Sequence, residues 1–129
     1  MKKNRHLGEA ELDIMMAIWE ANGPLTSVQV RDKLRGSRDW AMASIMTSLA
    51  RLVEKGFISC DKSSGINTYT ALVAEDAYKS QESKGLLERL YGNSVPKLVT
   101  NLYGSNLLDQ SDIDELRTLL DSLDGGVKE

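Results

Sequence analysis

Apolar residues recur at helical spacing along most of this chain, and the pattern predicts six helices. The expected helices cover residues 9–22, 27–35, 40–55, 74–91, 95–103 and 111–124. Between the third and the fourth, apolar and β-branched residues at 57–58 and 68–70 flank a polar turn, which predicts a β-hairpin. Gly56 is placed to end the third helix, and Gly125 and Gly126 to end the last one. The chain is therefore expected to be mainly α with one small β-hairpin.

The third predicted helix has two faces of different chemical character. Its apolar arc consists of Met42, Ile45, Met46, Leu49, Leu52 and Val53, and its opposite arc consists of Trp40, Ser44, Thr47, Ser48 and Arg51. Small hydroxyl side chains let a partner surface come close, and they donate hydrogen bonds to phosphates or to base edges. A helix, a glycine stop and a hairpin form the second half of a winged helix-turn-helix. An ordinary surface helix followed by a hairpin gives the same pattern, so this motif alone does not decide the function.

Basic residues surround the turn that precedes this helix, where they are expected to contact DNA phosphates. The predicted DNA-binding residues are Arg31, Arg35, Arg38, Trp40, Ser44, Thr47, Ser48, Arg51, Lys62 and Asn67. Residues 1–73 contain ten Lys/Arg and eight Asp/Glu, a net charge of +2, whereas residues 74–129 contain six and eleven, a net charge of −5. The front part is therefore the one that suits a polyanion.

The composition argues against several classes of function. The chain has 129 residues, 41% of them hydrophobic, which suits one or two small domains. No stretch approaches the roughly 18 apolar residues of a membrane helix, and residues 1–7 lack the apolar part of a signal peptide, so a cytoplasmic protein is expected. With Cys60 as the only cysteine and His6 as the only histidine, we expect no disulfide, metal or cofactor. Nothing resembles a nucleophile–base set or a phosphate loop, so an enzyme is not expected.

The last three predicted helices carry more apolar side chains than so small a unit can bury. The predicted dimerisation residues are Leu86, Leu90, Tyr91, Leu98, Leu102, Leu116 and Leu120. A leucine-rich tail behind a DNA-binding head is typical of a twofold dimer that reads a palindrome. The alternative is a self-contained three-helix cap on a monomer. We expect a winged-helix DNA-binding domain over residues 1–73 and a helical dimerisation domain over residues 74–129.

Several segments, taken in order, carry a resemblance to a known family. They are the opening LGEAELDIMMAIWE with Glu11, Met15 and Trp19, then Ile45, Thr47, Leu49, Arg51 and Leu52 followed by Lys55 and Gly56, then Tyr69 and Thr70, Leu90, Tyr91 and Gly92, the run LVTN at 98–101, and IDEL at 113–116 with Leu119 and Leu120. Each segment alone is a weak signal, but their combination in this order is specific. Over nearly its whole length the chain resembles the BlaI/MecI/CopY family of bacterial winged-helix repressors.

The resemblance implies a homodimeric transcriptional repressor bound to a palindromic DNA operator, typically of β-lactam resistance genes and of its own operon. In the penicillinase branch, repression is relieved by proteolysis in the dimerisation region, triggered by a membrane sensor protein. The cut follows an Asn that precedes a bulky apolar residue, which aligns with Asn101 and Leu102. Many relatives have Phe at the second position. The copper-responsive branch has paired cysteines near its C-terminus; this chain has none after Cys60, so no copper or zinc switch is implied.

Two departures lie on the predicted recognition helix. Ala43 stands where relatives often have a cation, and Met46 replaces a usual polar residue. These departures imply a different operator preference, with readout leaning on Ser44, Thr47 and DNA shape. They also keep a second class open, a winged-helix protein-interaction module without DNA binding. A ligand-gated repressor is a variant of the first class. Binding to DNA that weakens steeply with salt would separate the repressor from the interaction module.

Overall fold

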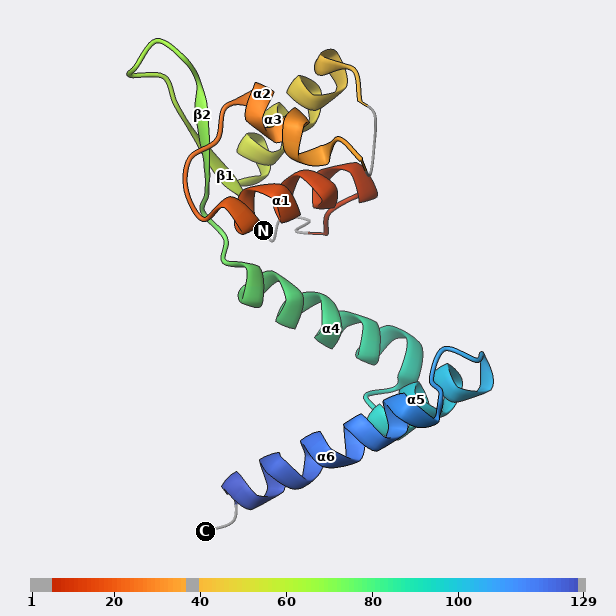
Figure 1. Ribbon diagram of the computed structural model, residues 1–129. Coiled ribbons are helices and arrows are strands. Elements are labelled where there is room, and N and C mark those ends of the chain that lie inside the picture. Colours follow the sequence, from red (N-terminus) through yellow and green to blue (C-terminus); the bar gives the residue numbers. More distant parts are fainter. Residues whose placement is uncertain (1–5, 37–39, 128–129) are drawn as a thin grey trace. The chain divides into compact units, whose positions relative to one another are not determined.

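The computed structural model describes residues 6–36 and 40–127, and these form six helices and one hairpin (Figure 1). The elements are α1 (Glu9–Ala21), α2 (Ser27–Leu34), α3 (Met42–Lys55), β1 (Ile58–Asp61), β2 (Thr68–Ala71), α4 (Glu75–Tyr91), α5 (Val95–Gly104) and α6 (Gln110–Val127). The mainly helical fold with one hairpin is the predicted one. By contacts the chain divides into two compact units, Met1–Glu82 and Ser83–Glu129, which are described separately.

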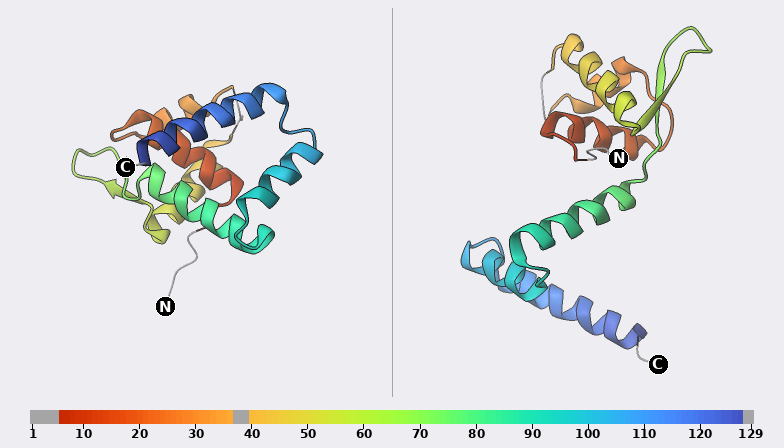
Figure 2. Two further views of the ribbon diagram at one scale, coloured as in Figure 1. Left: turned by 90° about the horizontal axis from the view of Figure 1, so that it is seen from below. Right: turned by 180° about the vertical axis from the view of Figure 1, so that it is seen from behind.

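The first unit packs α1, α2 and α3 around one core, which the hairpin closes on one side (Figure 2). Its largest fully buried side chains are Phe57, Ile14, Met15, Ile18, Ile45, Leu49, Leu52, Ile58 and Val30. β1 and β2 pair antiparallel, with Ile58 opposite Ala71 and Asp61 opposite Thr68. Leu25 adds a single antiparallel bridge beside β2, because its N–H and carbonyl both hydrogen-bond the backbone of Tyr69. This arrangement is a winged helix-turn-helix.

Local sequence signals set the helix ends of this unit. The Thr26 hydroxyl accepts a hydrogen bond from the Gln29 N–H, and the Gln29 side chain accepts one from the Thr26 N–H, which forms a capping box. Gly56 ends α3 with φ +83°, a left-handed conformation that favours glycine. The chain can therefore turn sharply from α3 into β1.

The last helix departs from its predicted bounds at both ends. It begins before residue 111 and is capped by Asp109, because Asp109 and Asp112 each accept a hydrogen bond from the other's N–H. The helix also continues through Gly125 and Gly126 to Val127. Glycine lowers helix stability by about 1 kcal/mol relative to alanine, but it does not by itself force an end.

The start of α4 belongs to the first unit. Tyr78 is 5% exposed, and its ring lies 5.7 Å from that of Phe57 and 6.0 Å from that of Trp19. The Trp19 ring N–H donates to the Val73 carbonyl at 2.8 Å, which fixes the segment that leads into α4. The contact division accordingly falls inside α4, between Glu82 and Ser83. The expected boundary between a DNA-binding domain (1–73) and a dimerisation domain (74–129) is defined by function and stays a prediction.

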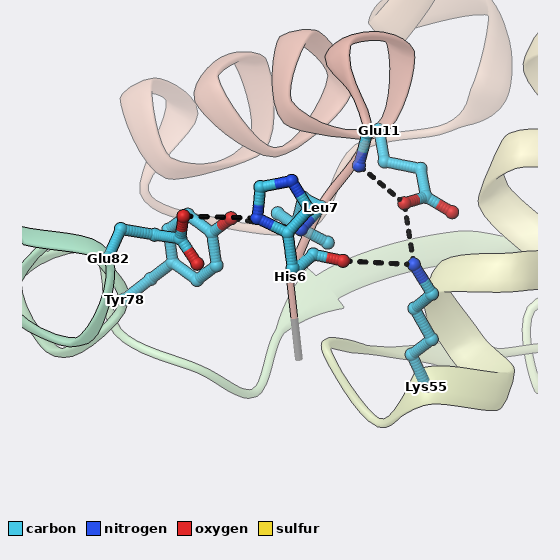
Figure 3. A network of polar contacts seen from close by, with 7 residues as sticks. His6, Leu7, Glu11, Lys55, Tyr78 and Glu82 are labelled. Atoms are coloured by element: carbon cyan, nitrogen blue, oxygen red, sulfur yellow. Dashed lines mark hydrogen bonds and ion pairs between the residues drawn. The ribbon is translucent and has the colours of Figure 1, made fainter. Parts of the chain in front are cut away.

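A network of polar contacts joins the N-terminal segment to α1, α3 and α4 (Figure 3). The Glu11 carboxylate accepts hydrogen bonds from the Gly8 N–H at 3.0 Å and from the Lys55 ammonium at 2.7 Å. The same ammonium donates to the His6 carbonyl, and the His6 ring contacts the Glu82 carboxylate at 3.1 Å. Lys55 ends the helix that carries the predicted DNA contacts, so this network fixes α3 relative to α1.

The pKa of Glu11 is lowered. Burial acts to raise the pKa, but the bonds from Lys55 and Gly8 and the positive charges of Lys55 and Arg51 together outweigh it. A carboxylate with a lowered pKa stabilises the fold above its ordinary value near 4.5. That contribution is lost as pH falls through the lower, folded-state pKa.

Glu11→Gln is therefore expected to lower the free energy of unfolding at pH 7 by about 1–3 kcal/mol, because it leaves the Lys55 ammonium half-buried without its anion. Denaturant unfolding at pH 7 and at steps below pH 4.5 measures this, and the gap to the parent protein should narrow in acid. Glu54→Gln is the control, because Glu54 is exposed and should change stability by less than about 0.5 kcal/mol. Equal effects of the two changes would contradict the assignment.

The second unit contains the end of α4, α5 and α6. Asn93 and Asn106, with φ of 65° and 63°, make the breaks that the sequence predicted on each side of α5. Within residues 83–124, for which side chains are described, no residue is buried. Large apolar side chains instead remain exposed: Leu86, Leu90, Val95, Tyr103, Leu107, Leu119, Leu120 and Leu123. A single copy of this unit thus leaves much of its apolar surface in water.

Candidate nucleic-acid interface

The exposed face of α3 and the turn of the hairpin are the two parts of the first unit that project candidate DNA contacts. α3 turns Ile45, Ser48, Leu49 and Leu52 into the core, so the opposite side of the helix faces solvent. Ser44, Thr47 and Arg51 are exposed there, as predicted. Lys62 and Asn67 are exposed at the two ends of the hairpin turn.

The hairpin turn between these two residues is held by its own side chains. The Asp61 carboxylate accepts a hydrogen bond from the Ser63 N–H at 2.9 Å, which lowers the pKa of Asp61. The Ser64 hydroxyl donates to the Ile66 carbonyl at 3.2 Å, and Gly65 adopts a φ of +89°. These bonds order the turn locally.

Ser48 does not belong to the exposed face. It is 7% exposed, so the prediction that it lies on the outer arc was wrong. Ser48 falls between Ile45 and Leu52 in the i, i+3, i+4, i+7 series of the buried side, and its small side chain fits there. The prediction centred the apolar arc too close to Met46 and Val53, which are both 39% exposed.

The other predicted DNA contacts differ in how exposed they are. Trp40 is half-buried and packs against the core, so it supports the start of α3 more than it projects from it. Arg31 is also half-buried. Arg35 is exposed, and its guanidinium pairs with Asp32 at 3.1 Å. Arg38 lies outside the described residues.

Three residues on the exposed face of α3 are absent from the predicted DNA contacts. Ala43, Met46 and Ala50 are exposed and lie next to Thr47 at helical spacing. Centring the helical pattern on Ile45 and Leu49 alone would have placed Ala43 and Ala50 on the opposite side of the helix and Met46 on the flank of the buried arc. Met46 was instead assigned to the apolar arc because of its residue type.

No helix within residues 6–36 and 40–127 is long and apolar enough to cross a membrane. In the same residues, no group of three or more His, Cys, Asp or Glu side chains is arranged to hold a metal ion.

Three helices, a two-stranded wing and an exposed third helix define a winged-helix protein of the DNA-binding class. The sequence profile of the family described as Penicillinase repressor matches residues 7–122. The methicillin resistance regulatory protein MecI of Mammaliicoccus sciuri is 32% identical over 92% of this chain and 95% of its own length. The penicillinase repressor of Bacillus licheniformis is 29% identical over 94% of each chain. The chain belongs to the penicillinase repressor family, whose members are transcriptional repressors and not enzymes.

Two solved structures agree with this assignment. The DNA-binding domain of the repressor BlaI in solution is 31% identical, with a TM-score of 0.52 over 60% of this chain and 94% of that one. The monomeric form of Bacillus licheniformis BlaI in complex with the blaP half-operator gives a TM-score of 0.50 at the same identity and coverage. The winged-helix fold and the family resemblance drawn from the sequence are thereby confirmed.

Proposed function

We propose that this protein represses transcription as a homodimer that binds a palindromic DNA operator through two winged-helix heads. The observation that carries the proposal is the exposed α3 beside an exposed wing, in a head that matches the DNA-binding domain of BlaI. The BlaI complex with a half-operator supports the same use of the fold here. β-Lactam resistance genes are the expected targets, because the relatives named above regulate penicillinase or methicillin resistance.

In this proposal the elements divide the work of recognition. The start of α3 lies in the major groove, where a recognition helix places its N-terminal residues against base edges. Ser44 and Thr47 lie in the first two turns, and Arg51 lies one turn later, where its guanidinium pairs with a phosphate. Lys62 and Asn67 on the wing, with Arg31, Arg35 and Arg38, contact the neighbouring backbone.

Arg51→Ala is expected to weaken binding to all duplexes and to lower the slope of log affinity against log salt by about one unit, since one phosphate contact is lost. Thr47→Ala is the matched comparison on the same face, and it should act mainly on the specific operator. Gel-shift titrations at several salt concentrations measure both. An unchanged slope for Arg51→Ala would remove Arg51 from the interface.

The same titration tests the alternative that the protein is a winged-helix interaction module without DNA binding. A winged-helix module that binds only proteins would show no duplex binding with a steep salt dependence. Glu11→Gln is not a suitable variant for the DNA titration, because it is expected to lower the free energy of unfolding.

The second unit supports the dimer part of the proposal. Leu90 and Leu120 are 64% and 53% exposed in a single copy, and Leu86 is 38% exposed. Tyr91, Leu98, Leu102 and Leu116 are half-buried, so their stripes are only partly covered within one chain. A second copy that packs against these stripes would remove both sets from water, which is favourable at about 25 cal/mol per Å² of apolar surface. We assign the second unit, which begins at Ser83, to this contact. The first turns of the helical domain expected from residue 74 would then belong to the head.

Relief of repression is proposed to follow from cleavage between Asn101 and Leu102. Asn101 is exposed on α5 and accepts a hydrogen bond from the Tyr91 hydroxyl at 3.2 Å, while Leu102 is half-buried. α5 has ten residues, none of them buried, so opening it costs little. A membrane sensor protease is the expected partner, as in the penicillinase branch that the sequence resembles.

A further inference from the structure

The start of α3 lacks the charged and amide side chains that most often read bases. Residues 41–50, AMASIMTSLA, include no Arg, Lys, Asn, Gln, Asp or Glu. Those residue types make the hydrogen bonds that identify guanine, adenine and cytosine in the major groove. Because a recognition helix contacts bases with its N-terminal residues, the usual polar readers are missing from the turns that would meet the bases.

The side chains exposed in those turns are mostly apolar. Ala43, Met46, Thr47 and Ala50 follow the spacing i, i+3, i+4, i+7, so they form one continuous helix face, and all four are exposed. We call them the reading face. Met46 is 39% exposed although its side chain is long and apolar, and it does not belong to the buried core cluster.

The Thr47 hydroxyl is already engaged within the helix. Its Oγ1 donates to the Ala43 carbonyl at 3.0 Å, one turn earlier. A hydroxyl has a single hydrogen, so in this conformation Thr47 cannot donate to a base acceptor. It keeps an acceptor lone pair and its methyl group. Even the polar member of the reading face is thus mainly a methyl-bearing side chain.

One group on the major-groove edges of the bases matches such a surface. Thymine carries a C5 methyl, and Ala and Thr side chains make apolar contact with it. We propose that this repressor selects its operator chiefly through thymine methyl groups packed against the reading face, with Met46 as the main specificity-determining residue. The inference rests on the proposed function, because it concerns how the same interface tells operators apart.

The test uses full-length protein and duplexes that it selects from a random-sequence pool. In the best-bound duplex, each thymine is replaced in turn by deoxyuracil, which removes only the C5 methyl and keeps every hydrogen bond of the base pair. We expect a loss of about fourfold in affinity for each contacted methyl, the factor that burial of one such group is worth. Thymines outside the half-sites should give no loss.

Met46→Ala then identifies the contact. At the thymine that Met46 covers, the variant should bind the thymine and the uracil duplexes equally, while other contacted positions keep their loss. Met46→Leu should restore most of the discrimination, because leucine supplies a similar apolar surface. Met16→Ala is the matched control: Met16 is 43% exposed on α1, so it loses the same atoms away from the reading face.

The outcomes distinguish a failure of methyl readout from a failure of the proposed repressor function. Selected duplexes that bind with a steep salt dependence but lose nothing on uracil replacement would overturn methyl readout and leave the repressor function standing. A loss at defined thymines that Met46→Ala abolishes at one of them would establish it. If the pool yields no enriched duplex and no salt-dependent binding, the proposed function fails, and methyl readout fails with it.

Discussion

Replacing Leu120 with lysine is expected to convert the proposed dimer into a monomer and to lower operator affinity by about two to four orders of magnitude. The loss is large because two linked heads bind two half-sites with an avidity that either head lacks alone. Leu120 is 53% exposed in a single chain, so the change opens no cavity within the subunit. In the dimer it would place a charge in an apolar contact, which is costly unless the charge is paired. Sedimentation at micromolar concentration and gel shifts measure the two effects.

Thr118→Lys supplies the matched control for this prediction. Thr118 is exposed on the same helix, on the side opposite the apolar stripe, and its hydroxyl donates to the Asp114 carbonyl. The variant gains the same charge and should remain a dimer with nearly unchanged affinity. A parent protein that sediments as a monomer, or a Leu120→Lys variant that stays dimeric, would refute the proposed contact.

Cleavage between Asn101 and Leu102 is expected to have an effect of similar size. The cut separates α6 from the head, so the stripe that carries Leu116 and Leu120 is no longer tethered to the reading face. The head should stay folded, because its core is complete by Tyr78. Cells that carry the sensor should yield fragments 1–101 and 102–129 after β-lactam treatment, as mapped by mass spectrometry.

Asn101→Arg tests whether this bond is the one that matters. Asn101 is exposed, so an arginine is tolerated in α5 while the residue before the cut changes. Cells with this variant should stay repressed after β-lactam treatment. Ser105→Arg adds the same charge at an exposed position just after α5 and should leave induction normal. Full derepression with an intact chain would exclude proteolysis and favour a ligand-gated repressor.

Much of the fold was predictable because its signals are local. The helical stripe of α1 and the Thr26–Gln29 capping box act within a few residues. The stop at Gly56 is equally local, because a left-handed conformation suits glycine best. The hairpin follows from β-branched and aromatic residues on both sides of a polar turn. Such features form whatever the rest of the chain does, so periodicity and turn chemistry suffice to place them.

The errors on α3 have a physical cause. Residue type does not reveal which of six apolar side chains meet the core, and including Met46 and Val53 rotated the expected buried arc toward them. Ser48 lies on the far edge of the true arc, where a small polar side chain fits against its neighbours. A methionine in the sequence is a poor predictor of burial, because its long flexible side chain adapts to either environment.

The contact between Glu11 and Lys55 was beyond prediction for a different reason. The two residues are 44 positions apart, and only the packing of α1 against α3 brings them together. In the sequence both residues stand out only through the family resemblance. The structure shows instead that Glu11 holds the end of the helix that carries the candidate DNA contacts.

The reading face shares no residue with the core, and this separation bears on how such repressors diversify. Substitutions at exposed positions usually change stability by no more than about 0.5 kcal/mol. Ala43, Met46 and Ala50 can therefore vary between paralogues without endangering the fold. A duplicated gene would be free to drift toward a new regulatory target by a few point mutations, each passing through a folded protein. Cross-talk between coexisting repressors of this kind would then depend largely on these few positions, while the buried core of the head is held by selection for folding.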